Sequence, residues 1–328
     1  MTWIDARTAA SRINSWGKHS GAFFFLISYD KSKCLVERVS DISDTELLFD
    51  FPHLSNSAKV ETPDNQASFT WQPHPLTALE YSKRFSIIHQ NMLAGNSYLA
   101  NLTCKTPIDT SLTLKEIFMR SKARYKLWLN DRFVCFSPET FVRINQGVIS
   151  SCPMKGTISC SVANAEQVLM DDVKEAAEHA TIVDLIRNDL SKVAEKVTVR
   201  RYRYVEKLNT NCGDILQTSS EIAGVLPADY RSHLGDIIMA QLPAGSITGA
   251  PKRKTMEIIH QAEGYDRGFY TGVAGVCQGG KLDSCVLIRF IDKENGKLYF
   301  KAGGGITAKS DCKKEYEEVI EKTYVPIC

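Results

Sequence analysis

The chain has 328 residues, of which 43% are apolar and 24% charged, and its formal net charge is +2. This composition is that of a globular protein with room for one large domain or two ordinary ones. The small net charge and the lack of a long basic tract give no reason to expect nucleic-acid binding. The first residues show no signal-peptide pattern, and the apolar run at 22–27 is too short to cross a bilayer. None of the ten cysteines is spaced C-x-x-C, which favours reduced thiols and a cytoplasmic protein.

The first half of the chain alternates short strands with helices. Apolar runs at 22–29, 34–39 and 68–71 predict a small β-rich region over residues 1–75, with 56–67 as a possible linker. A helical repeat then begins at Leu76, continues through Tyr81, Phe85, Ile88 and Met92, and ends at Gly95. Strand-like runs follow at 97–102, 125–129 and 133–136, and a long helix is predicted over 163–190.

The second half ends in strands and a closing helix. An amphipathic helix is predicted from Pro251, and strands at 270–277 and 284–291 flank a glycine turn. A last strand at 298–302 leads through glycines into the closing helix. Because the strands form antiparallel-looking clusters instead of alternating strictly with helices, we predict an α+β fold. Residues 76–328 would form the main domain.

One lysine has an unusual place. Lys155 lies in the segment SCPMKGT, between a proline and a glycine at the end of a predicted strand. It is either a solvated loop residue or an amine held rigidly for chemistry, because burial or a nearby cation makes lysine nucleophilic. The segment alone leaves both interpretations open.

Two pairs of glutamates suggest a cation site. Glu175 and Glu178 are three residues apart on one predicted helix, and Glu315 and Glu318 are three apart on the closing helix, where Lys322 shares their face. Such faces are often only solvated ion pairs. Two pairs together, however, offer the oxygen ligands that Mg²⁺ prefers. The glycines at 303–305 are expected to follow a strand and to form a backbone nest for an anion.

The segment LPAGSITGAPKRKTMEII joins a glycine-rich loop to a helix. Its glycine and lysine spacing is not that of a phosphate-binding Walker loop, which argues against nucleotide binding. We expect the hydroxyls of Ser246 and Thr248 to face an anionic ligand instead. Arg289, in the apolar run DSCVLIRF, would meet either a substrate carboxylate or a structural ion-pair partner.

The segment GVCQGG, residues 275–280, contains the Gly-x-Cys-x-Gly pattern of glutamine amidotransferase nucleophiles. In those enzymes the cysteine lies at a strand-to-helix turn, whereas here a turn and another strand are predicted to follow Cys277. A catalytic histidine would also have to come later, and the last histidine is His260. We therefore expect no glutamine hydrolysis by this route.

Six motifs along residues 78–328 resemble, in the same order, those of the chorismate-utilising enzymes. GNSYLANLT, SPETF and PMKGT resemble the family's G-D-x-Y-Q-V-N-L, S-P-E-x-F and P-I-x-G-T. EHATIVDLIRNDL is similar to E-H-L-M-L-V-D-L-x-R-N-D-L. PAGSITGAPKRKTMEII and AGGGITAKSDCKKEYEEVIEK resemble the family's loop and closing helix. The resemblance implies a layered antiparallel β-sandwich with outer helices, as in anthranilate synthase component I-like enzymes, and a chorismate-binding catalytic domain over 76–328.

The resemblance also implies a branch of the family and its chemistry. Lysine at position 155 is typical of the branch that aminates chorismate at C4 on the route to 4-aminobenzoate and folate, whereas anthranilate-forming members carry alanine there. Lys155 would be the covalent nucleophile and Glu139 the general acid/base. The ammonia would come from a separate glutamine amidotransferase subunit. Alternatives are an anthranilate-, isochorismate- or salicylate-forming enzyme, and, more remotely, a non-catalytic carboxylate-binding partner.

The remaining implied roles concern the metal and the pocket. Mg²⁺ would be held by Glu178 and Glu318, with Glu175 and Glu315 close by. The positions that match substrate-binding positions of the family are Gly156, Thr157, Ser246, Tyr270, Arg289, Gly304, Gly305 and Lys322.

Two departures from the family pattern stand out. Gln217, in LQTSSEIAG, occupies the position of the family's usual histidine, which is consistent with a reaction that stops at the amino product. The N-terminal region lacks the tryptophan-binding L-L-E-S motif, so we expect no tryptophan inhibition.

Overall fold

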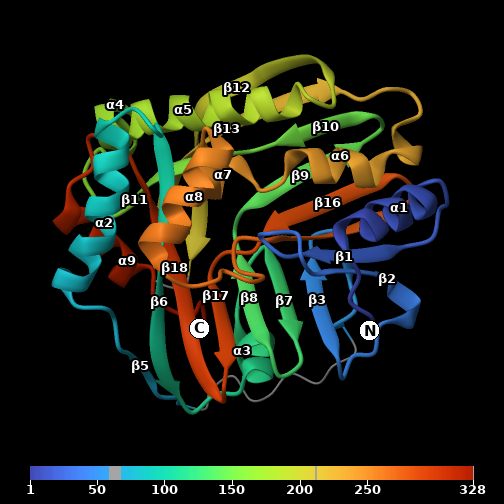
Figure 1. The fold of residues 1–328 in the computed structure, drawn as a ribbon, viewed down its shortest axis with the longest axis horizontal. Coiled ribbons are helices and arrows are strands. Elements are labelled where there is room, and N and C mark those ends of the chain that lie inside the picture. The colour runs from blue at the N-terminus through green and yellow to red at the C-terminus, as the bar shows by residue number, and fades with distance from the viewer. Residues whose placement is uncertain (59–67, 211–212, 328) are drawn as a thin grey trace.

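The computed structural model describes residues 1–58, 68–210 and 213–327 and shows two antiparallel sheets facing each other, with helices outside (Figure 1). The first sheet has the spatial order β11 (Met154–Ser159), β13 (Gly213–Val225), β10 (Val148–Ser151), β9 (Thr140–Asn145), β16 (Lys281–Val286), β15 (Val273–Gln278), β1 (Phe23–Ile27) and β2 (Cys34–Arg38), with β12 (Glu195–Thr210) paired along β13. The predicted α+β sandwich is confirmed.

The second sheet contains strands from the middle and the end of the chain. Its order is β14 (Gly249–Ala250), β6 (Leu99–Thr110), β18 (Lys297–Ile306), β17 (Phe290–Glu294), β8 (Phe133–Ser137), β7 (Tyr125–Leu129), β3 (Leu47–Phe51) and β4 (Leu54–Ser55), with β5 (Trp71–Pro73) paired to β6. Strands of the first 75 residues therefore contribute to both sheets, since β1 pairs with β15 and β3 with β7.

Helices cover the outer faces of both sheets. They are α1 (Ala6–Gly17), α2 (Ala78–Leu93), α3 (Leu114–Arg120), α4 (Ala165–Asp171), α5 (Val173–Leu190), α6 (Leu234–Gln241), α7 (Gly245–Thr248), α8 (Lys252–Glu263) and α9 (Cys312–Glu321), with short 3₁₀ turns at Val39–Asp41 and Tyr230–Ser232. Helices α1, α5 and α6 pack on the first sheet, and α2, α8 and α9 pack against β6 and β18. No helix in these ranges is long and apolar enough to cross a bilayer.

Strand β1 shows why the core forms here. All five of its residues are buried, because Phe23, Phe25 and Ile27 face the helices while Phe24 and Leu26 face the other sheet. The ring of Phe24 stacks on Phe49 of β3 at 5.1 Å. Tyr81, Phe85, Ile88 and Met92 of α2 are buried as predicted, and a capping box at Thr77 fixes the start of that helix.

Several predicted elements differ from the structure. Helix α1, with Ile13 buried, lies where only strands were predicted. The helix predicted over 163–190 is interrupted at Asp172, whose extended backbone ends α4 and caps α5. The strand predicted over 284–291 is broken as well, because β16 ends at Val286 and β17 begins at Phe290 in the other sheet. The proposed linker falls largely on residues 59–67, outside the described residues.

Candidate active site

Lys155 lies in β11 and extends toward helix α5. A bulge separates it from Thr157 in the pairing with β13, and Gly156 at the bulge has a φ of 71° that favours glycine. The hydroxyl of Thr218 on β13 donates to the Lys155 carbonyl oxygen. The Lys155 ammonium lies 3.7 Å from Glu178 Oε2, and its side chain is 22% exposed. Lys155 is thus a partly buried amine facing a carboxylate, and not a solvated loop residue.

Helix α5 presents two carboxylates to this amine. Asp172 accepts a hydrogen bond from the Glu175 backbone N–H and so begins the helix one turn before Glu178. Burial raises the pKa of both Glu175 and Glu178, and the Lys155 ammonium partly opposes the shift. Glu178 Oε1 is buried without a hydrogen-bond partner in the described part of the chain.

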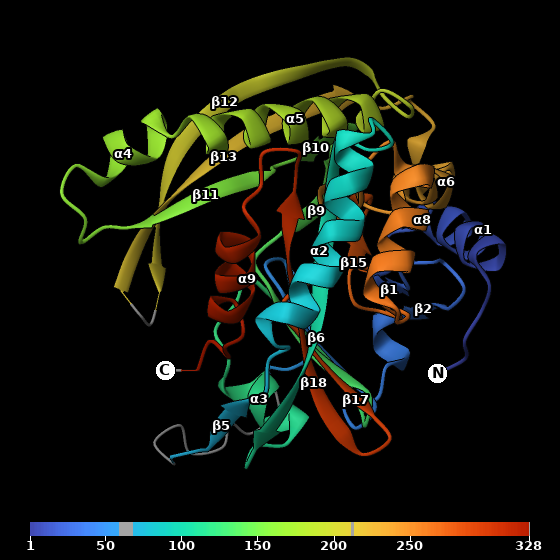
Figure 2. The same ribbon diagram turned by 60° about the vertical axis from the view of Figure 1, so that its left-hand side comes forward.

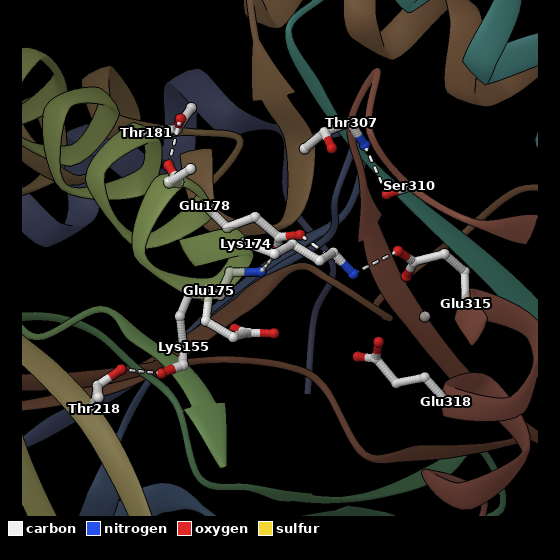
Figure 3. Close-up of polar contacts among 12 residues, drawn as sticks. Lys155, Lys174, Glu175, Glu178, Thr181, Thr218, Thr307, Ser310, Glu315 and Glu318 are labelled. Carbon is white, nitrogen blue, oxygen red and sulfur yellow. Dashed lines mark hydrogen bonds and ion pairs between the residues drawn. The ribbon is translucent and has the colours of Figure 1, made fainter. Parts of the chain in front are cut away.

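Helix α9 supplies the second pair of carboxylates. Glu315 is 1% exposed, and Glu318 forms an ion pair with Lys322 one turn later. Burial raises the pKa of Glu318, but the ammonium groups of Lys322, Lys155 and Lys174 together outweigh this effect, so the net direction is downward. The Lys322 ammonium also donates to the Gly303 carbonyl, at 3.1 Å. Figure 2 shows α5 and the ends of β11 and β13 extending over α9. Figure 3 shows the two glutamate pairs on opposite sides of the gap between α5 and α9.

Lys174 joins the two helices. Its ammonium lies 3.1 Å from Glu315 Oε1 on α9 and 3.7 Å from Glu178 Oε1 on its own helix, as Figure 3 shows. Burial lowers the pKa of Lys174, but Glu315 and then Glu178 raise it by more, so the net direction is upward. Lys174 was not among the predicted site residues, although its i, i+4 spacing to Glu178 was a usable signal.

The donor set matches the chemistry of Mg²⁺, since all four side chains are carboxylates and one buried oxygen lacks a partner. In the described ranges, however, no three acidic, histidine or cysteine side chains converge closely enough to hold an ion. The four glutamates therefore fit the ion chemically, while the Lys174 ammonium lies between two of them.

Glu139 approaches the site from another direction. It follows β8, and the hydroxyl of Ser246 on α7 donates to its Oε1. Burial raises its pKa, which the Ser246 hydrogen bond and the charges of Lys155 and Lys322 partly offset. A small cavity that includes Glu139 and Ser246 extends toward Asp189 and Gln241. A carboxyl of this kind can hold a proton and donate it.

The glycines of the last strand do not form the predicted anion-binding nest. Gly303, Gly304 and Gly305 lie inside β18 and pair with β6, so they do not form a nest after the strand. They provide space instead. A Cβ on Gly304 would lie 3.4 Å from Glu315 Oε2, and one on Gly305 would lie 3.2 Å from the Lys155 ammonium.

Arg289 was predicted to lie inside a strand, and this prediction is wrong. It lies where the chain crosses from β16 to β17, with a φ of 53°. Its guanidinium donates to the Lys322 carbonyl at 2.9 Å and lies over the Tyr324 ring. Burial lowers its pKa. No carboxylate in the described chain forms an ion pair with it, and only the more distant charge of Glu318 opposes the guanidinium.

The remaining candidates divide between the site and its surroundings. Tyr270 is buried in the core next to Phe290, and burial raises its pKa. Thr157 is exposed on β11. Thr248 is buried, and its hydroxyl lacks a hydrogen-bond partner among the described residues. Gln217 lies opposite Thr157, with its amide near Ser219 and Met154.

His179, which follows Glu178 on α5, is buried, and its Nε2 lies 2.6 Å from Ser220 Oγ. Cys277 lies within β15 as expected, where a turn and β16 follow it, and burial raises its pKa to about 11. It therefore lacks the geometry and the acidity of an amidotransferase nucleophile.

The fold and the converging groups define a class of protein. The family description "chorismate binding enzyme" matches residues 6–327, and the chain belongs to this family.

Named relatives fall into more than one branch of the family. The chain is 46% identical over 314 residues to the "Uncharacterized PabA-like protein" of Haemophilus influenzae, covering 96% of this chain and 95% of that one. It is 32% identical over 283 residues to aminodeoxychorismate synthase component 1 of Klebsiella aerogenes, covering 80% of this chain but only 61% of that protein. Anthranilate synthase component 1 of Acetivibrio thermocellus is 37% identical over 199 residues, covering 58% and 39%.

Solved structures show the same fold. Anthranilate synthase component I from Streptococcus pneumoniae aligns with a TM-score of 0.63 and 25% identity, covering 78% of this chain and 59% of that one. The menaquinone-specific isochorismate synthase MenF from Escherichia coli aligns with a TM-score of 0.71 and 16% identity, covering 98% and 82%.

Proposed function

We propose that this chain is an aminodeoxychorismate synthase component I, which converts chorismate and ammonia to 4-amino-4-deoxychorismate. The observation that carries the proposal is the placement of Lys155. Its amine points into a group of carboxylates from α5 and α9, and the protonatable carboxyl of Glu139 interacts with it electrostatically. Relatives that bear this name are about 32% identical to the chain.

The proposed reaction has two covalent steps. The Lys155 amine forms a bond to C2 of the chorismate ring and loses a proton, both ring double bonds shift, and the C4 hydroxyl leaves as water with a proton from Glu139. Ammonia then forms a bond to C4 and loses a proton, both double bonds shift back, and the C2–N bond breaks to release the Lys155 amine, which regains a proton. Because the second displacement reverses the first shift, the ring keeps its unsaturation and no oxidant is needed.

The other site residues would bind charge. We propose that Arg289, Lys322 and the open space at Gly304 and Gly305 receive the substrate carboxylates, because Arg289 has no ion-pair partner among the described residues. Glu175, Glu178, Glu315 and Glu318 would hold Mg²⁺. When bound, the ion would neutralise the ring carboxylate.

The ammonia source is a further part of the proposal. Cys277 is a buried strand residue, so the amidotransferase pattern around it does not supply ammonia. Relatives are named as component 1, which supports a two-component enzyme with a glutamine amidotransferase subunit.

Product identification tests the proposal. Purified protein is incubated with chorismate, Mg²⁺ and ammonium, and the products are separated and identified by mass spectrometry. We expect 4-amino-4-deoxychorismate. Anthranilate would favour the anthranilate synthase alternative, which the Acetivibrio relative supports. Isochorismate or salicylate would favour those branches, and unchanged chorismate would favour a binding protein.

Lys155→Ala tests the covalent step. The variant lacks the amine, so we expect loss of the enzyme–substrate mass adduct together with loss of amination. Lys254→Ala is the matched control, because Lys254 is an exposed lysine on α8 whose ion-pair partner among the described residues is Glu257 alone. An unaltered amination rate in Lys155→Ala would remove the lysine from the mechanism.

A further inference from the structure

Lys174 occupies the space between the two glutamate pairs. It contacts Glu315, 141 residues away in the sequence, and Glu178 on its own helix (Figure 3). The other two lysines of the site serve different carboxylate oxygens, since Lys155 faces Glu178 Oε2 and Lys322 pairs with Glu318. One ammonium thus balances the two oxygens that face each other across the gap between α5 and α9.

This balance is incomplete at Glu178. Its Oε1 lies 3.7 Å from the Lys174 ammonium, which is too far for a hydrogen bond, and has no other hydrogen-bond partner in the described chain. A buried carboxylate oxygen without a bonded partner is costly. Lys174 therefore offsets the negative charge of Glu178 but leaves its Oε1 without a hydrogen bond, so this oxygen is still able to bind a cation.

The Lys174 ammonium is also able to move out of the gap between α5 and α9. Its side chain is 39% exposed, and the lysine stem is flexible, so the ammonium can turn outward into solvent. A Mg²⁺ ion must approach its oxygen ligands to about 2.0–2.1 Å, and it cannot do so between two oxygens that already share an ammonium.

We propose that Lys174 is an internal counter-cation that holds the acidic cluster together without metal and is displaced when a divalent cation binds. The inference rests on the Mg²⁺ site of the proposed function. Lys174 then stabilises the metal-free protein and lowers its affinity for the metal, because each Mg²⁺ that binds must first break the ammonium contacts.

The test measures Mg²⁺ binding to full-length protein without chorismate. Wild type, Lys174→Gln and Lys174→Met are compared by calorimetric titration and by Tm over a range of Mg²⁺ concentrations. Lys313→Gln is the matched control, because Lys313 is an exposed lysine on α9 that, within the described part of the chain, pairs only with Glu317. We expect both Lys174 variants to have a lower Tm without metal and a Kd for Mg²⁺ about tenfold smaller. Their Tm should meet that of wild type at saturating Mg²⁺.

Other outcomes overturn the inference. An unchanged Kd with a lower metal-free Tm would make Lys174 a tether between helices only, and a larger Kd would make it a support for the metal. Absence of saturable Mg²⁺ binding in wild type would remove the metal assignment as well. The product assay separates the two proposals: tighter binding in the variants together with anthranilate as product would keep this inference and reject amination.

Discussion

Lys155 and Glu139 interact electrostatically although they lie on separate parts of the fold. Glu139 follows β8 of the second sheet, and Lys155 lies on β11 at the edge of the first. Burial raises the pKa of Glu139, and Ser246 donates to the same carboxyl. Substitutions that remove the Lys155 amine or the Glu139 carboxyl should therefore lower the rate of the reaction.

Glu139→Gln should lower kcat by about 10²–10⁴-fold, because an amide cannot give a proton to the leaving hydroxyl. In the wild type, kcat should fall as pH rises through the raised pKa of Glu139, since the carboxyl acts in its protonated form. The pH–rate profile of purified protein checks both points.

The same substitution should also change stability. Between the ordinary carboxyl pKa and the raised native value, the folded protein keeps a proton that the unfolded chain has released. Glu139 therefore makes the free energy of unfolding fall as pH rises through this window. Urea unfolding should show a shallower fall in Glu139→Gln. Identical pH slopes in the two proteins would contradict the raised pKa.

Elements position the site through close packing as much as through side-chain chemistry. Two glycines show the contrast. A Cβ on Gly305 would meet only flexible side-chain ends, at 3.2 Å from Lys155 Nζ and 3.4 Å from Leu99 Cδ1. A Cβ on Gly272 would lie 2.3 Å from the backbone oxygen of Ile27.

Gly305→Ala should therefore lower kcat/KM for chorismate with little change in Tm, because it fills the space at Lys155. Gly272→Ala should lower the free energy of unfolding by about 1–3 kcal/mol, because the new methyl group would clash with the Ile27 backbone, which cannot move aside as a side chain can. Steady-state kinetics and thermal unfolding of the two variants make the comparison. Full activity in Gly305→Ala would show that substrate does not use this space.

The start of α5 offers a test of helix placement. Asp172 accepts from the Glu175 backbone N–H at 2.9 Å. Asp172→Ala should lower the free energy of unfolding by about 1 kcal/mol. Asp184→Ala is the control on the same helix, because Asp184 is 71% exposed and pairs only with Arg187. Urea unfolding that gives equal losses for both variants would exclude a capping role.

At the scale of the whole molecule, the N-terminal strands are part of both sheets. Strand β1 lies between β15 and β2, and Phe24 and Phe49 pack in the core between the sheets. A fragment of residues 76–328 would leave β15 and β7 with exposed edges and would uncover this core.

We therefore expect that fragment to aggregate on expression, whereas the full chain stays in solution. Sedimentation and size-exclusion chromatography of both proteins check the result. A soluble, monomeric fragment with native circular dichroism would show that residues 76–328 fold independently.

The local parts of this protein were predictable from the sequence. The apolar spacing of Tyr81, Phe85, Ile88 and Met92 predicts α2, because a helical period depends only on neighbouring residues. The i, i+3 spacing likewise placed each glutamate pair on one helix face. The strand that contains Cys277, and with it the exclusion of a glutamine nucleophile, also followed from local pattern.

Only the tertiary structure decided what those parts form together. An apolar run at 284–291 reads as one strand, yet the chain crosses between sheets there and places Arg289 at the crossover. The glycines of β18 lie at the site only because Gly303, Gly304 and Gly305 pair with Thr103, Leu102 and Asn101 of β6, far earlier in the chain. Lys174 contacts Glu315 because the tertiary structure brings α5 and α9 together. Long-range pairing carries no local period, so the sequence by itself determined which residues could form a site, and the packing of distant elements determined which of them do.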